Sequence, residues 1–373
     1  MEFIAWFFGK VYEYFARPVA NWDAFVHSIT YGLRMISALD SKTGWLFLIS
    51  SALVAHLIYI WEKKRGVISR ATSFLGFLLP RSVYRHRSAF ADYKYVVIDL
   101  TLKSITYLPI ISGIGYLSYK VTLMTRDALF PSLPGYITAP FSPFVTTLII
   151  VLIADFGVYF GHWLAHKVKF FWIFHQVHHS AEVLTPVTAY RGHPVDEMLA
   201  AIASGAIGGL FATAYTEFTG NNLELTTILG INVFNFFFFI AHQLRHSHIW
   251  FSYGPVLSRV FVSPAQHQIH HSLEERHWDK NFGFIFAFWD VLFRTIYVPK
   301  GREVFKLGVH GEDPEDFVTV GKLYWLPFVK AARHLRDETW MGRLTGLSKK
   351  PASDAAKPAI TAGGSTQSPT LSS

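Results

Sequence analysis

Histidine is concentrated in four short stretches of this 373-residue chain. Two of them have the pattern HxxHH and two have the pattern HxxxH. Residues three or four positions apart lie on one face of a helix, so each stretch can direct its imidazoles toward one point. The stretches are HWLAH, HQVHH, HQLRH and HQIHH, which contain His162 and His166; His175, His178 and His179; His242 and His246; and His267, His270 and His271.

This number of imidazoles favours a transition-metal site, because neutral imidazole is a common ligand of iron and zinc. Ten nitrogen ligands exceed the needs of one ion and fit two ions with about five each. The chain has no cysteine, which excludes thiolate ligands, disulfides and a cysteine nucleophile. One HxxxH pair arises easily by chance, whereas four such stretches on one predicted side of a membrane do not.

Four further polar residues are candidates for supporting the ligands. Asp155 lies seven residues before His162, two helical turns away on the same face. We expect it to accept the free N–H of a ligand imidazole, because carboxylates inside apolar spans tend to be functional. His193, which lies in YRGHPVDE, is expected in a similar role, although it could also be a ligand or a helix-entry residue. His248 and Asn235 complete the set, with His248 also a spare ligand.

The composition indicates a membrane protein. Hydrophobic residues make up 51% of the chain and charged residues only 16%, against about 25% charged in soluble domains. The net charge of +8 comes from lysine and arginine beside apolar stretches, as in polytopic membrane proteins. We therefore predict no nucleic-acid partner.

Five apolar stretches approach the length of about 20 residues that crosses a bilayer. Because the loop after the first is rich in lysine and arginine, it is predicted to be cytoplasmic, which places every histidine stretch on that side. The predicted fold is all-α, a polytopic membrane helical bundle with a cytoplasmic histidine-rich cap. The predicted spans are Gly44 to Trp61, Tyr95 to Tyr119, Phe144 to Gly161, Met198 to Tyr215 and Leu225 to Ala241.

Three regions are expected along the chain. Residues 1–43 are predicted to form an N-terminal interfacial segment, and residues 44–347 the membrane-embedded catalytic unit with its cap. Residues 348–373 are rich in Ser, Ala, Pro, Thr and Gly and are predicted to be a disordered tail.

The string DFGVYFGHWLAH, followed by HQVHHS and HQIHH, resembles the fatty acid hydroxylase and sterol desaturase superfamily of membrane-bound di-iron oxygenases. The resemblance covers about Tyr93 to Val298. Asp155, Tyr159 and His162 form the pattern D-x3-Y-x2-H, which is similar to the alkylglycerol monooxygenase branch, as is the later DKNFG…WD stretch.

The resemblance implies an O2-dependent di-iron oxidoreductase that hydroxylates or desaturates an unactivated C–H bond of a membrane lipid. It also implies that the ten histidines bind two non-haem iron ions. The substrate would be a sterol, acyl or ether lipid taken from the bilayer. Electrons would come from a separate reductase, ferredoxin or cytochrome, or from a pterin. The membrane would be a bacterial inner membrane or the endoplasmic reticulum.

Two other classes stay open from the residues alone. A haem-binding membrane electron-transfer protein needs only one or two axial histidines, fewer than are gathered here. A zinc-dependent membrane hydrolase often carries HExxH with a glutamate base, a pattern that this sequence lacks. The exact lipid, the choice between hydroxylation and desaturation, and the electron donor are not specified by the sequence.

Overall fold

The structure is a computed structural model that describes residues 45–103, 142–219, 231–239 and 241–338, with residues 20–27, 227–228 and a few isolated positions besides. Contacts divide the chain into two units, Met1–Phe328 and Val329–Ser373, and the histidine stretches lie in the first. The predicted segments 1–43 and 348–373 lie almost entirely or entirely outside the described residues.

The described elements are helical apart from one two-stranded ladder of two residues per strand, so the all-α prediction is confirmed. The α-helices are α3 (Trp45–Lys64), α4 (Phe74–Leu78), α5 (Arg81–Tyr84), α6 (Arg87–Leu102), α8 (Pro143–Lys167), α9 (Lys169–His179), α10 (Pro194–Thr219), α11 (Val233–Phe236), α12 (Gly254–Leu257), α13 (Pro264–His270), α14 (Phe288–Leu292) and α15 (Val320–Glu338). The 3-10 helices and strands are η3 (Pro186–Tyr190), η4 (Phe237–Phe239), η5 (His242–His246), η6 (Glu275–His277), η7 (Pro314–Phe317), β1 (Thr227–Ile228) and β2 (Ile231–Asn232).

Three described helices are long and apolar enough to cross a membrane: Trp45–Lys64, Pro143–Lys167 and residues Pro194–Ala212 of α10. They coincide with the first, third and fourth predicted spans. Most of the second predicted span, from residue 104 onward, lies outside the described residues.

The fifth predicted span, Leu225 to Ala241, is wrong. The described part of this segment consists of β1, β2, α11 and η4, none of which is long enough to cross a bilayer. Its apolar side chains are used differently: Val233 and Phe237 pack with Val151 of α8 and with Ile285 and Phe286. The apolar run is therefore a core segment against which the cap folds.

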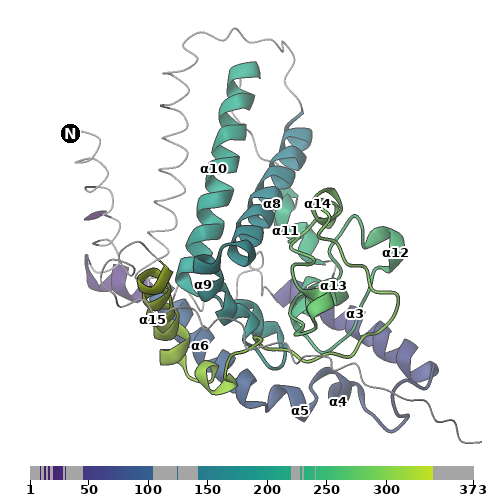
Figure 1. The fold of residues 1–373 in the computed structure, drawn as a ribbon. Helices are drawn as coiled ribbons and strands as arrows, with labels where there is room; N and C mark the ends of the chain where they lie inside the picture. The colour runs from purple at the N-terminus through teal and green to yellow at the C-terminus, as the bar shows by residue number, and fades with distance from the viewer. Residues whose placement is uncertain are drawn as a thin grey trace, which may run out of the picture. The chain divides into compact units, whose positions relative to one another are not determined.

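Helices α8 and α10 lie side by side (Figure 1) because small residues face each other where they cross. A Cβ atom added to Gly157 would lie 2.5 Å from the Cα of Ser204, and one on Gly161 would lie 3.1 Å from the Cα of Ala200. Such small-residue contacts let helices approach closely in lipid, where no hydrophobic force drives them together.

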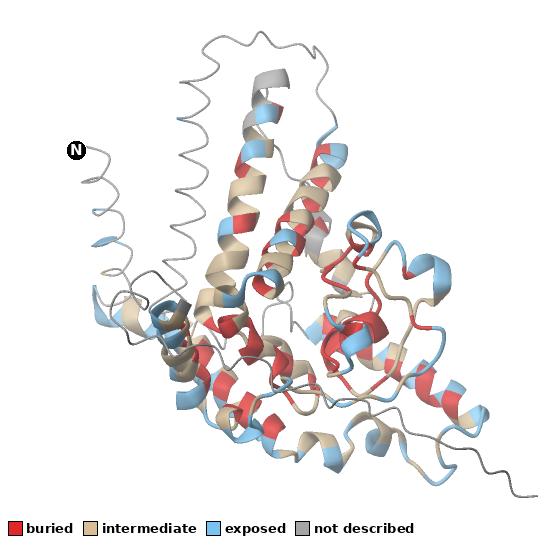
Figure 2. Cartoon of the chain, viewed as in Figure 1, coloured by how far each residue is buried: buried red, intermediate tan, exposed pale blue. Residues whose placement is uncertain are grey.

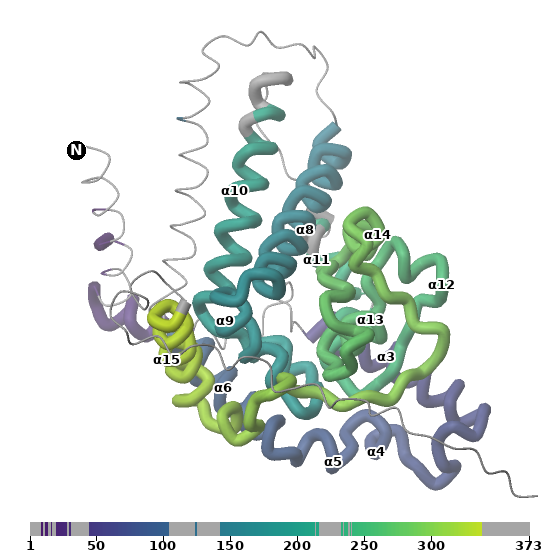
Figure 3. The backbone as a smooth tube through the Cα atoms, in the orientation of Figure 1, coloured from purple at the N-terminus to yellow at the C-terminus, as the bar shows by residue number. Residues whose placement is uncertain are grey.

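Local sequence signals define the helices that carry the histidines. Helix α8 starts at Ser142, whose side chain accepts from the N–H of Val145, with a proline at its first position. It ends at Val168, an extended residue after which α9 begins, and the backbone course can be followed in Figure 3. Helix α13 starts with a capping box between Ser263 and Gln266. Buried residues concentrate in α9 and α13 (Figure 2), whereas α3 and α8 expose apolar side chains such as Leu57 and Phe144.

Candidate metal centre

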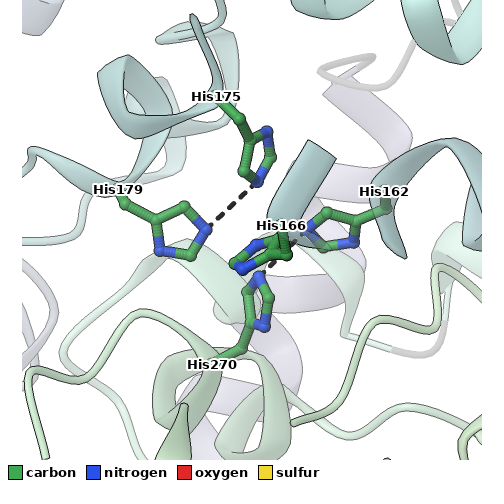
Figure 4. A group of neighbouring side chains, drawn as sticks. All are labelled: His162, His166, His175, His179 and His270. Atoms are coloured by element: carbon green, nitrogen blue, oxygen red, sulfur yellow. Dashed lines mark hydrogen bonds between the residues drawn. The ribbon is translucent and has the colours of Figure 1, made fainter. Parts of the chain in front are cut away.

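Nine of the ten predicted ligand histidines come together in two groups, although four separate chain segments supply them. Within each group one ligand nitrogen per residue lies within 4.8 Å of all the others. Figure 4 shows the rings of the larger group directed toward a common centre. Group one consists of His162, His166, His175, His179 and His270, and group two of His178, His246, His267 and His271.

The two groups are interleaved on the same short helices. Helix α9 gives His175 and His179 to group one and His178 to group two. Helix α13 and its C-cap give His270 to group one, and His267 and His271 to group two. The i, i+3, i+4 spacing therefore aims adjacent side chains of one turn at two neighbouring centres.

Hydrogen bonds fix the orientation of several rings. Nδ1 of His162 donates to the carbonyl of Phe282 (2.9 Å), and Nδ1 of His270 donates to that of Lys280 (2.7 Å). Nδ1 of His178 donates to the carbonyl of Arg191 (3.2 Å). A carbonyl oxygen can only accept, so in each neutral ring Nδ1 carries the proton and Nε2 carries a free lone pair.

A carboxylate supports a fourth ring. Nδ1 of His175 lies 3.0 Å from Oδ2 of Asp196, which leaves Nε2 of His175 directed at Nε2 of His179, 3.1 Å away. A ligand histidine commonly donates its second N–H to a carboxylate or a carbonyl, which sets its tautomer and raises its basicity as a ligand. Asp196 occupies that role here.

The free lone pairs face one another, and this arrangement fits a bound cation. Nε2 of His162 and Nε2 of His270 are 3.0 Å apart, although both rings use their only proton at Nδ1. Two lone pairs cannot form a hydrogen bond with each other. Nε2 of His166 is also buried and has no hydrogen-bond partner. A metal ion at the centre of group one would satisfy all three nitrogens.

The electrostatics also favour neutral rings in both groups. Burial, and then the charge of neighbouring imidazoles, holds the pKa of His179, His270 and His271 well below the usual value. The same causes lower the pKa of His178 to about 4. These four rings are thus unprotonated at neutral pH, which is the form that binds metal.

The loop after α13 presents the two carbonyls that orient His162 and His270. Asp290 holds this loop by accepting the N–H groups of Phe282 (2.8 Å) and Gly283 (2.9 Å), and it accepts a third bond from the Thr295 hydroxyl. A side chain at Gly283 has no room, since its Cβ would lie 2.6 Å from the carbonyl oxygen of Phe286. The motif NFG…WD in the sequence therefore builds a support for group one.

A buried ion pair supports group two. Arg191, whose carbonyl accepts from His178, is 1% exposed and donates to Asp92 of α6 at 2.7 Å. Its guanidinium also donates to the carbonyl of Val177 in α9 (3.1 Å). Sequence reasoning missed both residues, because nothing in the local pattern around Asp92 distinguishes it from a surface carboxylate.

Two sequence predictions about the site need correction. His242 lies outside both groups, with its ring against Phe284. It starts η5 after Ala241, which has a left-handed φ of 53°, so the HQLRH stretch is a tight 3-10 turn that directs His246 inward instead of an α-helix that aligns both rings.

Asp155 does not bond a histidine. It accepts from the N–H groups of Ile285 and Phe286 (2.7 and 3.1 Å) and from the indole of Trp289 (3.0 Å). Its carboxylate thus fixes the cap onto α8, and the support expected from Asp155 comes from Asp196 instead. Asp196 lies in the stretch YRGHPVDE, in which the sequence pattern indicated a supporting role only for His193.

The other supporting candidates also lie outside the two groups. His193 is the helix-entry residue of α10: its Nδ1 accepts from the N–H of Val195 and its Nε2 donates to the carbonyl of Tyr324. Nε2 of His248 donates to the carbonyl of Phe77 (2.8 Å). Asn235 lies in α11, which packs against α8.

Comparison with known proteins agrees with this architecture. Residues 147–295 match the fatty acid hydroxylase family model. This segment contains most of α8 and all of α9 and α13, and it includes every histidine of both groups. This segment is thus similar to the fatty acid hydroxylase family, so the predicted resemblance is confirmed.

Among curated proteins, the chain is 29% identical to an alkylglycerol monooxygenase of Caenorhabditis elegans over 150 residues, 40% of this chain and 26% of the relative. It is 29% identical to the ornithine lipid hydroxylase OlsE of Rhizobium tropici over 168 residues, 45% of this chain and 46% of the relative. It is 22% identical to a Delta(7)-sterol 5(6)-desaturase of Eremothecium gossypii over 225 residues, 58% of this chain and 55% of the relative. The chain thus matches only about a quarter to a half of each relative's length. No solved structure matches it significantly.

Proposed function

We propose that the protein is a membrane-bound, iron-dependent oxidoreductase that uses O2 to hydroxylate or desaturate an unactivated C–H bond of a lipid. The observation that carries this proposal is the pair of adjacent, all-histidine groups at the end of an apolar helix. The relatives named as lipid monooxygenase, hydroxylase and desaturase support it.

The groups suit two ions of one type. All nine side chains offer neutral nitrogen, and the ligand set within the described groups includes no carboxylate to serve as a hydrolytic base. Bound iron would supply the activation of O2 that C–H oxidation needs. In hydroxylation one oxygen atom enters the C–H bond, and the other leaves as water with two electrons and two protons from a reductant. In desaturation the substrate loses two hydrogen atoms, and these, together with two electrons and two protons from the reductant, convert both oxygen atoms to water.

The chain's own residues position and isolate the reacting centre. Asp196 and the carbonyls of Phe282, Lys280 and Arg191 hold the imidazoles with their Nε2 atoms inward. Most of the rings are buried, which limits the access of bulk water. We propose that the lipid arrives from the bilayer and that a separate electron-donor protein or a pterin delivers electrons. The location would be a bacterial inner membrane or the endoplasmic reticulum, with the site on the cytoplasmic side.

The test is metal analysis of the full chain purified in detergent, followed by incubation with lipid extract, a reductant and 18O2. We expect about two irons per chain and lipid products that carry 18O or have lost two hydrogens. A His270→Ala variant should lose iron from group one and all turnover. His242→Ala is the matched control, since it lies outside both groups and should keep its iron.

Other outcomes would overturn the proposal. A Soret absorption band would indicate haem. Zinc bound without any O2 consumption would indicate hydrolytic chemistry. If His270→Ala does not fold, as judged by size-exclusion chromatography, His270→Gln tests the same ligand with a side chain of more similar polarity.

A further inference from the structure

We propose that a pocket beside group one binds the anionic head group of the lipid substrate, so that oxidation takes place close to the head group and not in the middle of an acyl chain. This inference rests on the proposed function. It names the substrate class by charge and the part of the lipid that reacts.

The pocket has a volume of about 370 Å³ and reaches group one directly. Three of its lining residues are His166, His179 and His270, while Lys167 and Lys169 lie at its rim. Ligand pockets of about 300–1,000 Å³ hold molecules the size of a drug. The cavity is therefore suited to a polar head group, whereas a complete lipid is too large for it.

The charge of the rim favours an anion. Lys167 is neutralised by Asp279, whose Oδ2 lies 2.5 Å from its Nζ. Lys169 is exposed and makes no ion pair with any residue in the described ranges. The rim thus retains one uncompensated positive charge, which a phosphate or carboxylate can pair with.

Two tryptophans, Trp172 and Trp278, line the pocket, and this residue type is common at the membrane interface. The ring of Trp172 lies 5.0 Å from that of His166 and 5.4 Å from that of His179, so it forms part of the pocket wall next to these two histidines. Trp278 packs on His310 at 5.3 Å. Indole rings are favoured at the boundary between head groups and acyl chains.

The depth of group one determines which carbon can react. At about 1.5 Å per residue the 25 residues of α8 extend about 37 Å, more than the roughly 30 Å hydrocarbon core. His162 and His166 lie in its last turns. The pocket lies beyond them, beside Lys167. A lipid with its head group there places its first carbons, not its chain centre, beside group one.

The binding test uses isothermal titration calorimetry on the full chain in detergent. The probes are dihexanoylphosphatidylglycerol, dihexanoylphosphatidylcholine and inorganic phosphate. We expect the phosphatidylglycerol to bind about two- to fivefold more tightly than the phosphatidylcholine, which is the gain that one exposed ion pair contributes. Lys169→Gln should abolish this preference, and Lys300→Gln, an exposed lysine outside the pocket, should retain it.

The second measurement locates the oxygen or the double bond by tandem mass spectrometry of products formed with 18O2. A change in the head group or the first chain carbons supports the inference. A change deep in the acyl chain, an unchanged preference in Lys169→Gln, or phosphate binding as tightly as phosphatidylglycerol would each overturn it. Absence of any lipid product would contradict the proposed function instead, and the calorimetry would still decide whether the pocket selects anionic lipids.

Discussion

Asp196 is the side chain whose charge acts most directly on a candidate ligand, through its 3.0 Å contact with Nδ1 of His175. We predict that Asp196→Asn lowers the affinity of group one for iron about 10- to 100-fold, because loss of such a partner weakens the ligand and frees its ring. Competitive metal titration with a chelator measures the affinity.

Glu197→Gln is the matched control for this variant. Glu197 lies in the same turn, yet its carboxylate pairs with Lys103 and not with a histidine. Equal affinities in wild type and Asp196→Asn would show that His175 does not need its carboxylate.

The sequence predicted which histidines lie together, but it did not predict which groups orient their rings. Nine of the ten histidines gather as expected because helical spacing fixes where neighbouring side chains point. Of the four histidine rings whose Nδ1 atom has a hydrogen-bond partner described above, three donate to a backbone carbonyl. Because every residue has a backbone carbonyl, the residue type does not indicate which position will orient a ring. His242 does not join the other histidines, because Ala241, the residue before it, has a left-handed backbone conformation that the sequence pattern does not reveal.

At the scale of elements, the loop that supports group one depends on Asp290. Asp290→Ala leaves the N–H groups of Phe282 and Gly283 and the hydroxyl of Thr295 without their acceptor in a buried setting. We predict a loss of about 3 kcal/mol of stability and preferential loss of iron from group one. Thermal unfolding and metal analysis measure the two effects. Asp279→Asn, an exposed change in the same loop, should leave both unchanged.

The crossing of α8 and α10 provides a second prediction at this scale. Gly157→Leu forces the helices apart, because even a Cβ would lie 2.5 Å from the backbone of Ser204. Overpacking of this kind costs about 1–3 kcal/mol, which thermal unfolding in detergent detects. Gly208→Leu on α10 meets open space, and an equally large loss in that variant would argue against this explanation.

Hydrophobicity identified the three long helices but misread residues 225–241. Window averages do not distinguish an apolar run that faces lipid from one that packs on a protein core. Phe237 packs against Phe286 and Phe261, residues that follow it by tens of positions, and a local window contains no information about such contacts.

For the whole molecule, the buried imidazoles predict how stability depends on pH. The pKa of His178 is 6.5 when unperturbed and about 4 in the fold. Above pH 6.5 the His178 ring is neutral in both the folded and the unfolded chain, so its burial does not lower the free energy of unfolding through protonation. Between pH 6.5 and about 4 only the unfolded chain takes up the proton, so metal-free protein should lose stability through this window.

Denaturation of metal-free protein at a series of pH values measures this effect. Iron-loaded protein should be more stable throughout, since an ion that binds only the fold adds to its stability. Constant stability of the metal-free protein from pH 7 to 4 would contradict the prediction.

The shared helix α9 has a consequence for how the two proposed ions would bind. One turn carries His175 and His179 for one centre and His178 for the other. We predict that the first ion to bind restricts the motion of this turn and so lowers the entropic cost of binding the second ion. When iron is limiting, most molecules should therefore hold either no ion or two ions, and few should hold a single ion.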